Sequence, residues 1–250
     1  MELSLSKVIA TALSLSRREA ERRVKRGRIT VNGIPTLEAQ ALVRPNFDCV
    51  LHDNKPIPRP DSQKAKPRLF KLHKPTGFEC STSTHLSRRR TVFQLLEHLN
   101  LPRLMLVGRL DVDTSGLLLL TSCGRLSRHL ELPASGYVRE YSALIATGDR
   151  EITQEVIDVI GSGLTLPDGT RFRPVSVALN HTMSASRSAG VRMQLADGQK
   201  REIRRIWAHF GFAVSRLKRE RYGPFQLGNL PLSAVEEILP SALQPILDKF

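Results

Sequence analysis

Two aspartates lie in a short polar turn between two strongly apolar runs, within the segment Leu106–Thr121. A carboxylate that is fixed between two buried segments is well placed to form part of a pocket wall. Asp111 and Asp113 fit a turn-forming role equally well, because aspartate favours loops for its local hydrogen bonds. The residues alone leave both interpretations open.

A second candidate is an arginine at the start of a predicted helix. Apolar residues repeat at helical spacing at Ile203, Ile206, Trp207 and Phe210, and Gly211 is placed to end the helix. We expect Trp207 in the core, not as a base-stacking platform. Arg204 lies in the first turn, where free amides and the helix dipole help to hold a nearby carboxylate in its charged form. The alternative is a phosphate contact, because residues 199–222 carry eight Lys or Arg and two Glu.

The charge balance indicates a polyanionic partner. The 250 residues include 38 Lys or Arg against 24 acids, a net charge of +14, and the hydrophobic fraction of 40% suffices for a core. Nucleic acid fits this balance, and so does an anionic membrane surface or a merely basic, solvated exterior. The absence of a run of ~18 apolar residues argues against a membrane-embedded protein. The spread of basic residues along the chain argues against a membrane-surface helix.

Metal and disulfide chemistry have no support in the sequence. Cys49, Cys80 and Cys123 are far apart, which predicts free thiols in a reducing compartment. The histidines are scattered, and no H-E-x-x-H pattern occurs. We read the apolar opening at 1–15 as a folded helix, not a signal peptide.

The first sixty residues predict a small basic unit of two helices and a hairpin. Ser16 and Glu19 fit a capping box for a helix that begins at Arg17 and runs to about Arg26. A strand follows and ends at the turn Asn32-Gly33, a strong hairpin signal. The unit carries 11 Lys or Arg and 6 acids, which a solvated helix pair would also explain.

The rest of the chain predicts an α+β fold with a mainly antiparallel mixed sheet and flanking helices. A polar, proline-punctuated linker at 61–67 separates residues 1–60 from residues 68–250. We expect a strand at 191–195, hairpin turns at Asp168-Gly169 and Asp197-Gly198, and helices at 91–99 and 152–160. Basic residues at 88–90 and the polar stretch 180–190 predict exposed loops to which we assign no chemistry.

The order of parts at the N-terminus resembles the S4 RNA-binding domain over about fifty residues. The shared features are a helix, a basic capped helix and a strand that ends in Val-Asn-Gly. In that family the second helix lies on RNA, so the resemblance implicates Arg17, Arg18, Arg22 and Lys25. Backbone phosphate contacts of this kind would position the protein without reading the RNA sequence.

The aspartate segment, G-R-L-D-x-x-T-x-G-L-L-L-L-T, resembles the catalytic motif of the pseudouridine synthases, specifically the S4-containing ribosomal RNA group. Three further stretches match in the same order, beginning at Lys74, at Arg139-Glu140-Tyr141 and at Gly198. By this resemblance Asp111 is the nucleophile, and whether it attacks the sugar or the base stays open. Asp113 falls on a variable position of the motif and receives no role.

The resemblance also supplies partners for the nucleophile. The target base must leave its stack to reach a carboxylate, and Tyr141 is the candidate to lie against it. Arg109 corresponds to the arginine that helps to hold the RNA open, Arg204 to the arginine that pairs with the aspartate, and Ile203 to the aliphatic residue of the pocket. Lys74 is expected among the RNA-binding residues.

The resulting hypothesis is an RNA pseudouridine synthase, an isomerase that needs no cofactor and no metal. We expect ribosomal RNA or a pre-ribosomal particle as its partner, no membrane partner and a monomeric protein. Two stretches, 201–207 and 215–223, look more like the large-subunit enzymes, without identifying the uridine. The alternatives are a catalytically silent RNA-binding assembly factor and a glycosidic-bond hydrolase, which would need a second well-placed carboxylate. We expect a cytoplasmic location if the chain is bacterial, and the mitochondrial matrix or a plastid if it is eukaryotic.

Overall fold

The computed structural model describes residues 2–13, 15–45, 47–58, 66–81, 90–180 and 187–249. The chain divides into two compact units, Met1–Lys66 and Pro67–Phe250, and each contains its own apolar core. Most of the expected linker, residues 61–65, lies outside the described residues. So do residues 88 and 89 of the basic loop and residues 181–186 of the polar loop.

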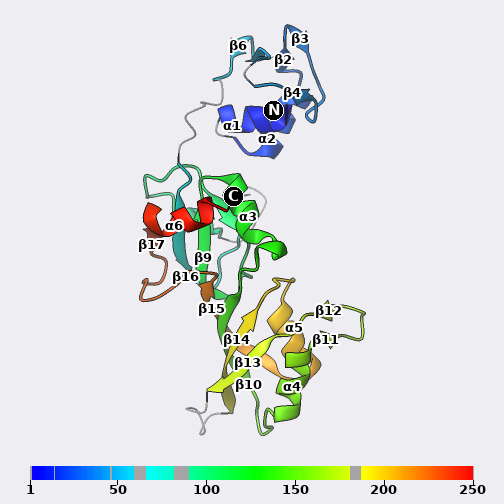
Figure 1. Ribbon diagram of the computed structural model, residues 1–250, viewed down its shortest axis with the longest axis vertical. Helices are drawn as coiled ribbons and strands as arrows, with labels where there is room; N and C mark the ends of the chain where they lie inside the picture. The colour runs from blue at the N-terminus through cyan, green and yellow to red at the C-terminus, as the bar shows by residue number, and fades with distance from the viewer. Residues whose placement is uncertain are drawn as a thin grey trace. The chain divides into compact units, whose positions relative to one another are not determined.

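The N-terminal unit combines two short helices with a small sheet (Figure 1). Its elements are β1 (Leu3–Ser4), α1 (Leu5–Ala12), α2 (Arg17–Lys25), β2 (Ile29–Val31), β3 (Ile34–Pro35), β4 (Leu42–Val43), β5 (Val50–His52) and β6 (Lys55–Pro56). Four strands pair in the order β3-β2-β5-β6, and β1 pairs with β4. Buried residues of α1, α2, β2, β4 and β5 form one apolar cluster, so helices and strands share a single core.

Two local sequence patterns in this unit, the Ser16 helix cap and the Asn32-Gly33 turn, form the structures that they predict. The Ser16 hydroxyl accepts a hydrogen bond from the backbone amide of Glu19 at 3.1 Å and caps α2. The Glu19 carboxylate, expected to reach back to Ser16, pairs instead with Arg22 and Arg23 at 2.7 and 3.3 Å. Positive φ angles of 52° and 81° at Asn32-Gly33 produce the tight hairpin between β2 and β3.

The C-terminal unit is built on a nine-stranded mixed sheet in the order β13-β14-β10-β15-β9-β7-β17, with β16 on β15 and β8 on β9. The elements of its first half are β7 (Leu69–Lys74), η1 (Val92–Leu95), β8 (Met105–Val107), β9 (Ser115–Thr121), α3 (Gly124–Glu131), η2 (Pro133–Ser135), β10 (Arg139–Ala146) and α4 (Gln154–Ser162). The remaining elements are β11 (Leu164–Thr165), β12 (Arg171–Phe172), β13 (Ser176–Asn180), β14 (Ser188–Leu195), α5 (Glu202–His209), β15 (Ala213–Tyr222), β16 (Phe225–Gln226), β17 (Val235–Glu237) and α6 (Pro240–Leu247).

Both faces of β9 are buried, which explains its continuous run of leucines. Leu117 and Leu119 belong to a core shared with α3 and α6. Leu118 and Leu120 point to the opposite face and join a second core with residues of β7 and η1. Packing on both faces therefore holds β9 in place, and with it the end of the preceding loop, residues 108–114.

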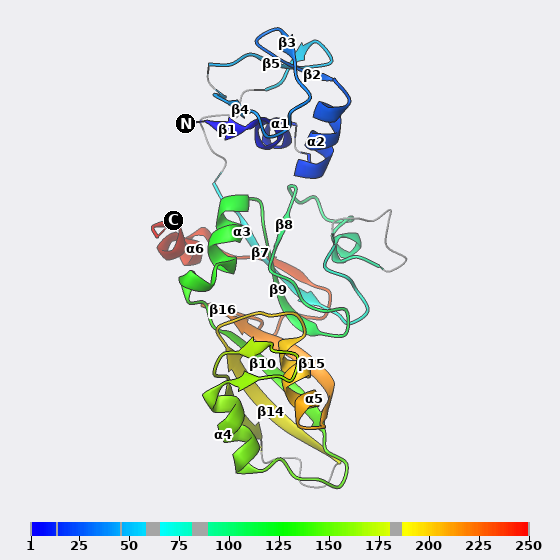
Figure 2. The same ribbon diagram turned by 90° about the vertical axis from the view of Figure 1, so that its right-hand side faces the viewer.

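A narrow seam joins the two halves of this sheet (Figure 2). β15 and β9 run parallel, and their ladder holds only the pairs Lys218 with Ser115 and Arg219 with Gly116. The other strand pairs described within this sheet are antiparallel. On one side of the seam, α4 and α5 cover β10 and β14 around the buried Trp207. The other side carries β7, β8 and β9, so the Asp111 loop and α5 belong to different halves.

Two local predictions are wrong. The expected helix at 91–99 forms only the 3-10 turn η1, because Val92 and Leu96 are both buried beside β7 and β9 and a tighter turn satisfies that packing. Asp197-Gly198 leads from β14 into α5 and does not turn a hairpin, since residues that favour turns also suit a strand-to-helix connection. The hairpin at Asp168-Gly169, the strand within β14 and the helices α4 and α5 are confirmed.

Candidate active site

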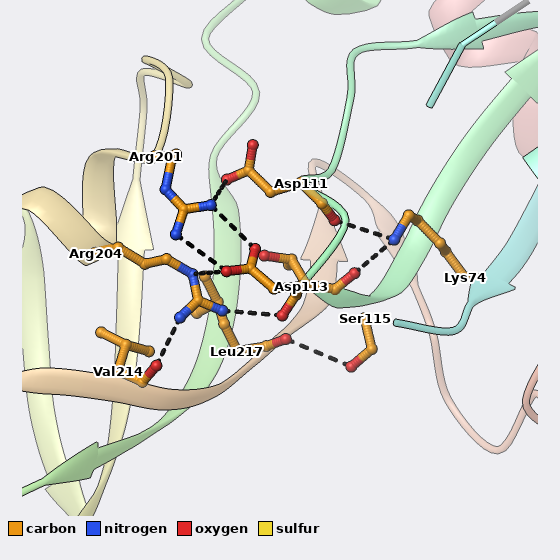
Figure 3. Close-up of polar contacts among 9 residues, drawn as sticks. Lys74, Asp111, Asp113, Ser115, Arg201, Arg204, Val214 and Leu217 are labelled. Atoms are coloured by element: carbon orange, nitrogen blue, oxygen red, sulfur yellow. Dashed lines mark hydrogen bonds and ion pairs between the residues drawn. The ribbon is translucent and has the colours of Figure 1, made fainter. Parts of the chain in front are cut away.

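Asp111 lies in the loop between β8 and β9, and its backbone is held from several directions. The Asp111 carbonyl accepts a hydrogen bond from the Thr114 amide at 3.1 Å, and the Val112 carbonyl accepts one from the Gly77 amide at 2.7 Å. The Lys74 ammonium donates to the Asp111 carbonyl at 3.0 Å and to the Thr114 carbonyl at 2.8 Å (Figure 3). The backbone is thus fixed while the Asp111 carboxylate stays 35% exposed.

Lys74 does not serve as an exposed RNA contact in this structure, which corrects the prediction. Its side chain is fully buried, and its ammonium also donates to the Pro75 carbonyl at 3.0 Å. Burial lowers the pKa of Lys74, against the charges of Cys80, Asp113 and Asp111, which act to raise it. Three carbonyl acceptors use its three donors, so its role is to hold the Asp111 loop.

Arg204 pairs with Asp113 and not with Asp111, which differs from the expectation based on the resemblance. Its Nε atom lies 3.2 Å from a carboxylate oxygen of Asp113, and one Nη donates to the Asp113 carbonyl at 2.9 Å. The other Nη donates to the Val214 carbonyl of β15 at 2.6 Å. Asp113, to which the sequence assigned no role, therefore forms the ion pair with Arg204 that was expected for Asp111.

Arg201 completes the arrangement (Figure 3). It donates to both carboxylate oxygens of Asp113 at 3.2 and 3.0 Å, and its Nη1 lies 4.0 Å from Oδ2 of Asp111. Burial acts to raise the pKa of Asp113, but the Arg201 hydrogen bonds and the charges of Arg204 and Arg201 outweigh it, so the pKa falls below 3.8. Asp113 is therefore ionised at neutral pH.

The other predicted pocket residues lie near this cluster. Ile203 is buried in the core beneath α5. Tyr141 is half-buried on β10 and packs against both that core and the core that contains Leu110, the residue before Asp111. Arg109 is exposed in the Asp111 loop itself. The structure thus brings residues from motifs far apart in the sequence to the seam between the two halves of the sheet.

The predicted RNA-binding residues of the N-terminal unit lie along α2. Arg17, Arg18, Arg22 and Lys25 are all exposed there. Arg17 donates to the Ser4 hydroxyl at 3.3 Å, and Arg22 pairs with Glu19. The positive surface of this helix is thus neutralised only in part.

Sequence reasoning missed Arg201 and Asp113. Asp113 could have been found as a second ionised carboxylate in the same turn as Asp111. Arg201 gave no comparable signal, since it is one of eight basic residues between 199 and 222.

Among the described residues, no group of three or more His, Cys, Asp or Glu is arranged to hold a metal ion. No described helix has the length and apolar character needed to cross a membrane.

The fold, with catalytic-motif residues gathered at the seam of a mixed sheet, defines an enzyme of the pseudouridine synthase class. The profile of the RNA pseudouridylate synthase family matches residues 68–209. A solved structure described as a pseudouridylate synthase superimposes with a TM-score of 0.65 and 22% identity, covering 97% of this chain and 98% of that one. This likeness concerns the fold alone.

Relatives match over nearly the whole chain. An uncharacterized RNA pseudouridine synthase of Rickettsia felis is 35% identical over 234 residues, or 94% of this chain and 96% of the relative. The ribosomal large subunit pseudouridine synthase B of Vibrio cholerae is 36% identical over 228 residues, or 89% of this chain and 67% of the relative. The chain belongs to the RNA pseudouridylate synthase family.

Proposed function

We propose that this chain converts one uridine of large-subunit ribosomal RNA into pseudouridine, with Asp111 as the nucleophile. The reaction breaks the bond from N1 of the base to C1′ of the ribose and forms a bond from C5 to C1′. C5 loses a proton and N1 gains one, so the base is isomerised without a change of oxidation state. Relatives named ribosomal large subunit pseudouridine synthases support this substrate class.

The observation that carries the proposal is the way Asp111 is held. Lys74, Thr114 and Gly77 fix the backbone of its loop, and the carboxylate itself remains partly exposed beside Arg201, the residue before α5. A positioned, ionised carboxylate is what nucleophilic attack on the nucleoside requires. In this proposal Tyr141 and Ile203 line the pocket for the flipped base, and Arg109 helps to keep the RNA open.

The N-terminal unit serves in this proposal as an S4-like module that docks α2 on the phosphate backbone of the same RNA. Its basic residues would position the enzyme without reading the sequence. The protein then acts as a monomer, in the cytoplasm of a bacterium or in an organelle that contains ribosomes.

The test is to replace Asp111 by asparagine, which keeps the shape and removes the charge. We expect Asp111→Asn to abolish pseudouridine formation in a large-subunit ribosomal RNA transcript, with RNA affinity kept within a few-fold. The matched control is Asp149→Asn, because Asp149 is an exposed aspartate at the far end of β10 that pairs with Arg187. Turnover by Asp111→Asn above a few per cent of the wild-type rate would remove Asp111 from the nucleophile role.

Mapping pseudouridines in ribosomal RNA from cells with and without the protein would identify the target uridine. A wild-type protein that binds this RNA and leaves every uridine unmodified would instead indicate a silent assembly factor.

A further inference from the structure

The Asp111 loop and α5 are tied together across the seam by one carboxylate and two arginines. The two Asp113 carboxylate oxygens accept hydrogen bonds from the two Nη atoms of Arg201, and one of them also lies 3.2 Å from Nε of Arg204 in an ion pair (Figure 3). The backbone link between the same two halves is the two-pair ladder of β9 with β15. Beside this ladder, the Ser115 hydroxyl donates to the Leu217 carbonyl and the Arg219 Nε to the Leu117 carbonyl, and the ion pairs to Asp113 are the charged contacts of the seam that lie next to Asp111.

Arg201 adopts a backbone conformation that favours glycine. It is the residue before α5, with φ 54° and ψ 30°, a left-handed region that L-residues with a Cβ atom visit rarely. Such a conformation persists where the surroundings hold it, and it is often found at functional sites. An arginine nonetheless occupies this conformation here, and its side chain hydrogen-bonds Asp113 and lies 4.0 Å from Asp111.

The distances from Arg201 indicate different roles for the two carboxylates. Arg201 makes paired hydrogen bonds with Asp113, whereas its Nη1 is 4.0 Å from Asp111, too far for a hydrogen bond but close enough for attraction between opposite charges. Asp113 thus occupies the edge of the guanidinium that carries its two terminal nitrogens. Asp111 keeps the influence of the positive charge without being locked in a two-pronged ion pair, and its oxygens stay free to react.

We propose that Arg201 and Asp113 form a clamp that positions Asp111 for the reaction. Both are positioning residues that act through Asp111 and the start of α5, and neither touches the uridine. The inference rests on the proposed function, because it assigns the clamp to the step that Asp111 performs. It adds a second arginine and a second carboxylate to the pair that the resemblance implies.

The test compares single-turnover rates at saturating RNA, using a large-subunit ribosomal RNA transcript labelled with [5-³H]uridine, which releases tritium when C5 loses its hydrogen. We expect Arg201→Ala and Asp113→Asn each to lower the rate by about 10- to 100-fold, since misplacing a reacting group by about 1 Å has effects of this size. The RNA concentration for half-saturation should change by no more than about two-fold. Arg201→Lys should recover part of the rate, because lysine keeps the charge but not the planar fork.

The double variant separates a clamp from two independent residues. If Arg201 and Asp113 act together, the double variant should be no slower than the slower single variant, instead of showing the product of the two losses. The matched control is Arg205→Ala. Arg205 is also an arginine of α5 in an ion pair, with Asp168 at 2.6 Å, and we expect a rate within about two-fold of wild type.

The melting temperature of each variant shows whether a loss of activity is caused by a loss of folding. The Arg201 and Asp113 side chains are 43% and 45% exposed, and ion pairs this exposed contribute little to stability, so the shift for Arg201→Ala should stay within about 4 °C. Asp113→Asn also removes the charge opposite Arg204, whose side chain is 13% exposed, so its rate is measured well below its own melting temperature. A wild-type rate for Arg201→Ala, or losses that multiply in the double variant, would overturn the clamp.

A third result would assign Arg201 to RNA binding. In that case the saturated rate would hold, and the slope of log affinity against log salt would shrink by ~0.7–0.9, the value for one lost phosphate contact. A wild-type protein that releases no tritium would overturn the proposed function and the clamp's role with it. An active wild type with an unaffected Arg201→Ala variant would overturn the clamp alone.

Discussion

Gly116 lies directly against the backbone of β15, where the two halves of the catalytic sheet meet, and Gly116→Ala should separate them. A Cβ atom at this position would lie 2.3 Å from the Arg219 carbonyl oxygen and 2.5 Å from the Arg219 amide nitrogen. Both are backbone atoms of β15, so no side-chain rotation relieves the clash. The φ angle of +106° is in addition one that an alanine rarely adopts.

These two effects set the expected size of the loss. Backbone strain of this kind costs about 1–3 kcal/mol, and forcing extra volume into a packed site costs about 1–3 kcal/mol more. The sum, roughly 2–6 kcal/mol, corresponds to a fall in melting temperature of about 4–24 °C, at about 2–4 °C per kcal/mol for a unit of this size. Turnover should fall further, because widening the seam moves the Asp111 loop away from Arg201 and Arg204.

The assay is thermal unfolding followed by circular dichroism, with Gly169→Ala as the matched control. Gly169 also has a positive φ, +80°, but a Cβ atom there would meet nothing within 4 Å. Gly169→Ala therefore measures strain without the clash and should cost about 1 kcal/mol, a few degrees at most. If Gly116→Ala were no less stable than Gly169→Ala, the argument that the close approach of β15 requires a glycine would be refuted.

Three further variants test other parts of the structure. Lys74→Met should destabilise the protein by about 2–4 kcal/mol and abolish turnover, because it removes the ammonium that donates to three carbonyls, of which the Thr114 carbonyl is buried and the Asp111 carbonyl keeps only its bond from the Thr114 amide; a melting temperature within a degree of wild type would contradict this. Burial raises the pKa of Glu202 above 4.5 against the opposing hydrogen bond from the Gln199 amide, so its stabilising contribution is present below that value and is lost as pH rises through the folded-state pKa. The melting temperature of Glu202→Gln, relative to that of wild type, should therefore be higher at about pH 8 than at about pH 4. An equal difference at the two pH values would count against this prediction. For the N-terminal unit, Arg18→Ala with Lys25→Ala should flatten the salt dependence of RNA binding by ~1.4–1.8, and an unchanged slope would mean that α2 does not lie on phosphates.

Elements whose signals are local could be read from the sequence. Ser16 caps α2 because its side chain and the amide it binds are three residues apart. Asn32-Gly33 turns the hairpin because those residue types accept positive φ. The apolar repeat around Trp207 places one face of α5 in the core. In each case the partners lie within one turn of helix or one hairpin, so spacing alone carries the information.

The charge pairs of the site could not be read in this way. Arg204 was chosen for its place in the first turn of a predicted helix and by the resemblance, and nothing in the sequence pointed to Arg201. On the residues alone, Asp111 and Asp113 were equivalent as carboxylates in one turn. Which arginine meets which carboxylate depends on the register of β15 against β9, which pairs residues about a hundred positions apart in the chain, such as Gly116 and Arg219.

Lys74 shows why a matched motif did not predict the contacts of its lysine. The stretch that begins at Lys74 resembles a family motif, and Lys74 was expected among the RNA-binding residues, although lysine is rarely fully buried and this one is. The carbonyls of Asp111 and Thr114 that surround its ammonium come 37 and 40 residues later in the sequence. They converge only after β7 and β9 have paired, with Lys74 opposite Gly116. A loop that exposes its carboxylate to substrate must satisfy its own carbonyls inward, and a buried ammonium with three donors is a side chain suited to satisfying several of them at once.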